Sequence, residues 1–75
     1  MPDHFDPAVF RRRLKHLRIV VAKLSTQEFA SRANVSPGTI NHYETARCSP
    51  SAYAVVNICK AFGVSADWLL GLTEE

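Results

Sequence analysis

The sequence lacks the features of a secreted or membrane-spanning chain. Its 75 residues include only two cysteines, Cys48 and Cys59, which is too few for the disulfide framework of many small secreted domains. No stretch approaches the roughly 18 consecutive apolar residues of a membrane span, and the polar first four residues are unlike a signal peptide. We therefore expect a cytoplasmic protein that does not associate with membranes.

Patterns typical of catalysis and metal binding are lacking as well. Neither His4 nor His16 has a cysteine or a second histidine at a metal-ligand spacing. No nucleophile, base and orienting group occur together at a credible spacing. We therefore expect no enzyme activity, no metal and no cofactor, and interpret the chain as a binding module.

Charge of either sign is modest, with a net charge of +2, but it is unevenly distributed. Residues 1–24 carry six basic and two acidic side chains, whereas residues 48–75 carry one basic and three acidic ones. A basic first half and an acidic tail would orient the chain on a polyanion, although a basic helix face that is merely solvated remains the alternative. The 47% hydrophobic content indicates one globular domain, 1–75. We expect its ends, 1–5 and 73–75, to fray.

Helix signals dominate the chain, and no β-branched run alternates for long enough to make a strand. Asp6 and three serines precede apolar-periodic segments in the way that N-caps do. Phe10, Leu14, Leu17 and Val21 form one apolar stripe at helical spacing. The sequence therefore predicts an all-α fold with five helices, over residues 6–22, 25–33, 36–45, 51–62 and 65–70. In the fourth helix the predicted apolar face consists of Ala52, Val55, Val56, Cys59 and Phe62.

The second and third helices have the makings of a helix-turn-helix. Ser25 and Glu28 have capping-box spacing, so that the Ser25 hydroxyl can accept the Glu28 N–H while the Glu28 carboxylate accepts the Ser25 N–H. A turn of only three residues, 34–36, joins the two helices. Ala30 is expected at their closest approach, because a larger side chain would push the third helix away.

These residues resemble a known family. The matching residues are Leu24 to Ala30, Val35, Ser36, Ile40, Tyr43, Glu44, Pro50 and the ending Phe62 to Leu70. Over residues 9–72 they resemble the phage lambda repressor and Cro-type helix-turn-helix family. The resemblance implies a five-helix domain that binds operator DNA as a symmetric dimer, with the third helix in the major groove. It also implies an ion pair between Arg18 and Glu44.

The sequence departs from this family at three places. The first helix runs one residue longer before Ser25 than is usual, and Thr45-Ala46 replaces the usual Asn-Gly after Glu44. The third helix begins Pro37-Gly38, where relatives often carry long amides or arginine. Because this start offers few hydrogen-bonding groups, we expect Asn41 and His42, assisted by Thr39, to make the base contacts.

Contacts to the DNA backbone are expected at the start of the second helix, where free N–H groups favour a phosphate, and at basic and hydroxyl side chains nearby. The expected residues are Ser25, Thr26, Gln27, Ser36, Thr45, Arg47, Arg11, Arg12 and Lys15. Leu70 and Leu72 are the candidate interface of a homodimer. The function predicted is that of a Cro-like or small repressor or control protein. The alternative is a protein-interaction module, such as an antitoxin or adaptor, on the same scaffold.

Overall fold

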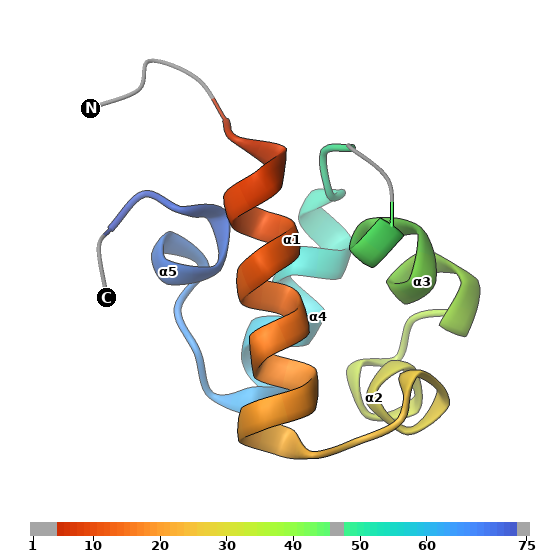
Figure 1. Ribbon diagram of the computed structural model, residues 1–75. Helices are drawn as coiled ribbons and strands as arrows, with labels where there is room; N and C mark the ends of the chain where they lie inside the picture. Colours follow the sequence, from red (N-terminus) through yellow and green to blue (C-terminus); the bar gives the residue numbers. More distant parts are fainter. Residues whose placement is uncertain (1–4, 46–47, 74–75) are drawn as a thin grey trace.

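The computed structural model describes residues 5–45 and 48–73, and every regular element in these ranges is helical. The elements are α1 (Pro7–His16), the π-helix η1 (Leu17–Ala22), α2 (Thr26–Ala33), α3 (Pro37–Thr45), α4 (Ala52–Phe62) and α5 (Ala66–Leu70). α1 runs through the middle of the molecule, with α2 and α3 on one side of it and α5 on the other (Figure 1). The all-α prediction and the five helix positions are confirmed, since each predicted range begins at or just before an observed helix. No helix in the described part of the chain is long and apolar enough to cross a membrane.

Local capping accounts for where these helices begin. Asp6, Ser25, Ser51 and Ser65 each accept a hydrogen bond from a backbone N–H in the first turn of the helix that follows. These bonds satisfy N–H groups that have no partner within the helix. α2 ends at Asn34, whose left-handed backbone (φ 55°) is one that asparagine adopts more readily than most residues.

The core lies between α1 and the other helices. Phe10 of α1 meets Tyr43 of α3 edge-to-face, with ring centroids 5.5 Å apart, while Phe29 of α2 stacks on Phe62 of α4 at 4.3 Å. Ala30 is fully buried, as expected for a close-packing point between α2 and α3. The two aromatic pairs tie the helix-turn-helix to α1 on one side and to α4 on the other.

The predicted apolar stripe of the first helix is wrong at Val21. That residue is 61% exposed, whereas Phe10, Leu14 and Leu17 are buried. The winding changes from α to π at Leu17, which changes the angle between successive residues, so that the α-helical periodicity of the stripe no longer predicts which positions face the core.

The predicted apolar face of α4 needs correction as well. Val56 and Ala52 are exposed, while Ala54 and Ile58 are buried and were not assigned to the face. α4 itself carries apolar residues on most of its faces, so periodicity alone does not distinguish the buried residues from the exposed ones. Cys59 and Cys48 are free, half-buried thiols that pack against the core, and burial raises the pKa of Cys59.

Candidate nucleic-acid interface

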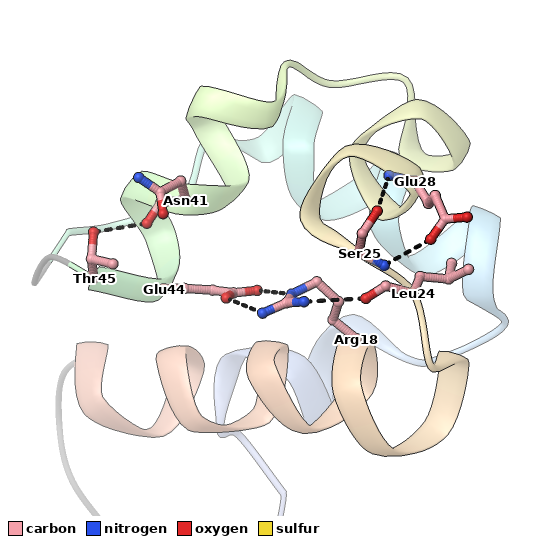
Figure 2. A network of polar contacts seen from close by, with 7 residues as sticks. All are labelled: Arg18, Leu24, Ser25, Glu28, Asn41, Glu44 and Thr45. Atoms are coloured by element: carbon pink, nitrogen blue, oxygen red, sulfur yellow. Dashed lines mark hydrogen bonds and ion pairs between the residues drawn. The ribbon is translucent and has the colours of Figure 1, made fainter.

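Arg18 holds the two helices of the helix-turn-helix in place. Its Nε donates to Glu44 Oε2 at 2.7 Å and one terminal nitrogen donates to Glu44 Oε1 at 2.9 Å, forming a two-pronged ion pair with the last turn of α3. Its other terminal nitrogen donates to the carbonyl of Leu24, next to the cap of α2, at 3.1 Å. One side chain from η1 therefore fixes the end of α3 and the start of α2 together, as Figure 2 shows. The family resemblance implied this ion pair, and the structure brings the two side chains together.

The pair is largely withdrawn from solvent. The side chain of Arg18 is 16% exposed and that of Glu44 is 6% exposed. The hydrogen bond to Glu44 raises the pKa of Arg18, which favours the charged guanidinium. Charge-assisted, two-pronged bonds of this kind are short and directional, and they give α3 a defined position relative to α2.

The start of α2 carries the complete capping box. Ser25 Oγ accepts the Glu28 N–H at 3.1 Å, and Glu28 Oε1 accepts the Ser25 N–H at 2.9 Å (Figure 2). This backbone hydrogen bond from Ser25 lowers the pKa of Glu28. The Ser25 side chain is thus engaged in the capping box. Thr26 is half-buried and Gln27 is exposed beside it.

α3 presents its two expected base-reading residues to solvent. Asn41 and His42 are both exposed, on the side of the helix away from the buried Ile40 and Tyr43. Thr39 is half-buried, and its hydroxyl is bonded to Ser36 Oγ at 2.7 Å. The outward surface of α3 is therefore polar and centred on an amide and an imidazole.

The remaining predicted contacts are placed less favourably. Thr45 donates its hydroxyl proton to the carbonyl of Asn41 at 2.8 Å, so it has no proton left for a phosphate (Figure 2). Arg12 and Lys15 are exposed on the side of α1 opposite its buried residues, with Arg11 half-buried near them. Arg47 and Ala46 lie outside the described residues.

Arg13 has a role that the sequence analysis missed. It was counted only among the six basic side chains of residues 1–24, but it is 7% exposed. Its guanidinium donates to the carbonyls of Trp68 and Thr73, the latter at 2.9 Å, and lies over the Trp68 ring at 5.6 Å. Its Nε is buried without a partner. The only sequence signal is its spacing of three from Phe10 and four from Leu17, which places it on the apolar stripe.

Comparison with family models adds to this geometry. A model described as a helix-turn-helix domain matches residues 9–69, which is most of the chain. The chain belongs to the helix-turn-helix domain family. In a DNA-binding helix-turn-helix the second helix of the motif occupies the major groove, and here that helix is α3. Comparison with curated proteins and with solved structures finds no match.

Proposed function

We propose that the chain is a sequence-specific regulator of transcription that binds double-stranded DNA and reads a palindromic operator with α3. The observation that carries this proposal is the Arg18 network. Arg18 joins the end of α3 to the start of α2 from the side of η1, and Asn41 and His42 remain exposed on the outer face of α3. A helix that reads bases needs this combination of a fixed position and free polar ends.

Asn41 and His42 are the proposed base readers. An asparagine can pair with adenine through two hydrogen bonds, and a histidine can donate to guanine N7 or to a phosphate. Thr39 assists through its methyl group, because its hydroxyl is already bonded to Ser36. This part of the proposal depends on the exposure of the two side chains.

The proposed anchors on the DNA backbone are the start of α2 and the basic side chains. Ser25, Thr26 and Gln27 lie where the helix dipole and free N–H groups favour a phosphate. Ser36 and Thr45 contribute less than the sequence analysis expects, since their hydroxyls already bond within the chain. Arg47 and the exposed Arg12 and Lys15, with Arg11, supply positive charge.

A homodimer completes the proposed complex. Each copy has one proposed reading helix, α3, whereas a palindromic site has two half-sites about 34 Å apart from centre to centre on one face of the DNA. One copy therefore covers a single half-site. Leu72, which is 58% exposed, and the half-buried Leu70 are the proposed contacts between copies.

Selection of bound duplexes from a random DNA pool tests this function directly. We expect the selected sites to share a palindromic sequence, and the affinity for them to fall steeply as salt rises, because phosphate contacts release counterions. If no sequence is enriched, or if binding is insensitive to salt, the chain is not the regulator proposed.

One observation favours the second candidate, a protein-interaction module such as an antitoxin or adaptor. Ile19, Val20 and Val21 are adjacent on η1 and are between 50% and 61% exposed. Association with a protein through this surface would change little with salt, in contrast to binding of DNA. The salt dependence of binding therefore separates the two candidates.

A further inference from the structure

The first turn of α3 has few groups left for hydrogen bonding outside the chain. Pro37 has no N–H. The hydroxyls of Ser36 and Thr39 are bonded to each other at 2.7 Å, and Ser36 Oγ also accepts the Thr39 N–H at 3.1 Å. What this turn presents outward is the exposed ring of Pro37 and the exposed backbone of Gly38.

The fold of the chain does not account for a glycine at position 38. A Cβ atom there would meet only Ser36 Oγ, at 4.0 Å. Gly63 and Gly71 have positive φ angles of 68° and 83°, whereas Gly38 is an ordinary helical residue. Glycine has a lower helix propensity than alanine, and at this position it relieves no close contact within the chain.

Gly38 lies on the proposed reading face. Residues three, four and seven positions apart share one side of a helix, so Gly38 is aligned with Asn41, His42 and Thr45. All four are exposed. The missing side chain therefore leaves open space next to the two proposed base readers, and the exposed Pro37 precedes it in the chain.

We propose that Pro37 and Gly38 form a recess that accepts the 5-methyl group of a thymine in the major groove, an inference that rests on the DNA-binding function proposed above. The thymine methyl is the apolar feature of the major-groove edges, and proteins recognise it by apolar contact rather than by hydrogen bonds. The absent Cβ gives the methyl group space, and the Pro37 ring gives it an apolar neighbour.

Removal of single methyl groups from the DNA tests the recess. The probe is the duplex that the wild-type chain selects from a random pool, with each thymine replaced in turn by deoxyuridine, which lacks the methyl group. We expect one position in each half-site at which the replacement weakens wild-type binding about fourfold, the value of one buried methyl group.

Gly38→Ala places a methyl group in the same space. We expect this variant to bind the thymine duplex about tenfold more weakly than wild type does. On the duplex with deoxyuridine at the sensitive position, the affinity of the variant should return most of the way to the wild-type value. Its melting temperature should not fall, because a Cβ at position 38 meets no clash. Ala61→Gly, a change of one methyl group at an exposed position of α4, is the control and should leave DNA binding unchanged.

The outcomes separate this inference from the proposed function. If wild type selects a site but Gly38→Ala binds it equally well, or loses as much on the deoxyuridine duplex as on the thymine duplex, the recess does not accept a thymine methyl group while the DNA-binding function stands. If wild type selects no duplex, both proposals fail.

Discussion

Glu44 carries a charge that the fold has almost completely removed from water. Its side chain is 6% exposed, and both of its carboxylate oxygens accept hydrogen bonds from Arg18. A buried ion pair contributes little net stability compared with apolar residues of the same size, but the loss of one partner leaves the other charge buried and unpaired. The pair therefore makes α3 sensitive to single substitutions.

Glu44→Gln should lower the stability of the folded domain by about 3 kcal/mol, because the guanidinium of Arg18 would remain buried without its counter-charge. For a domain of this size, that corresponds to a fall in the melting temperature of more than about 10 °C. Thermal unfolding followed by circular dichroism measures the change. Asp67→Asn, at an exposed position of α5, is the control. An unchanged melting temperature for Glu44→Gln would show that the pair does not hold α3.

Glu28 should make the stability of the domain depend on pH. The Ser25 hydrogen bonds lower the pKa of Glu28 below its ordinary value of 4.5. The stability that its charge contributes is then fully present above that value and is lost as the pH falls through the lower pKa of the folded state. We expect wild type to melt at a higher temperature than Glu28→Gln at pH 7, and the difference to vanish in acid. A difference that stays constant from pH 7 to pH 3 would contradict this.

Hydrogen bonds between neighbouring residues were easier to predict from the sequence than contacts between distant ones. The Ser25 and Glu28 capping box is local, so spacing alone predicts it. Arg13 looked like one of several surface charges, because its partners Trp68 and Thr73 are 55 and 60 residues away. The Arg18 and Glu44 pair is also distant in sequence, and only the family resemblance allowed it to be predicted.

At the scale of elements, the junction of α1 and η1 explains both a wrong prediction and a feature of the site. The change from α to π winding alters the angle between successive residues, and Val21, which α-helical periodicity places in the core, is exposed. Arg18 lies within the same segment, and its backbone carbonyl accepts the N–H groups of Lys23 and Leu24. The π segment therefore determines where the chain turns toward α2 and the position from which the Arg18 side chain extends. Helical periodicity assumes one type of winding, so it does not predict this change.

α3 is expected to read bases through separable side chains. Asn41→Ala should cost about 1–3 kcal/mol of discrimination at one base pair in each half-site, while nonspecific binding survives. His42→Ala should do the same at a neighbouring pair. Both side chains are exposed, so the fold should be unaffected. Repeating the selection from a random pool with each variant measures the change. Gln27→Ala, at a proposed contact to the DNA backbone on α2, is the comparison and should leave the sequence preference unchanged.

If both variants select the same site as wild type with the same preference at every position, α3 does not read bases through Asn41 and His42. The protein-interaction candidate would then be favoured, with the exposed Ile19, Val20 and Val21 as its surface. A change at one or two positions, with the rest of the site unaltered, is what direct contact predicts.

At the scale of the whole molecule, α1 separates two surfaces with different proposed roles. α2 and α3 lie on one side of it and α5 on the other (Figure 1). Arg13 fixes the end of α5 and the following residues to α1 through Trp68 and Thr73. Gly71 allows the chain to pass close to α1, since a Cβ there would lie 2.9 Å from a methyl carbon of Val9. Leu72 is thereby held in a defined, exposed position on the α5 side of α1.

Leu72→Asp should convert the proposed dimer into a monomer. In a two-fold symmetric dimer the same patch contacts its counterpart, so the substitution would place two carboxylates near each other and remove two apolar contacts. Leu72 is 58% exposed, so the fold itself should be retained. Sedimentation measures the oligomeric state, free and on the selected duplex, and Val56→Asp, at a 49% exposed position of α4, is the matched control. We expect the Leu72 variant to bind the palindromic site as weakly as a single half-site, whereas a wild-type chain that sediments as a monomer both free and on DNA would exclude the dimer.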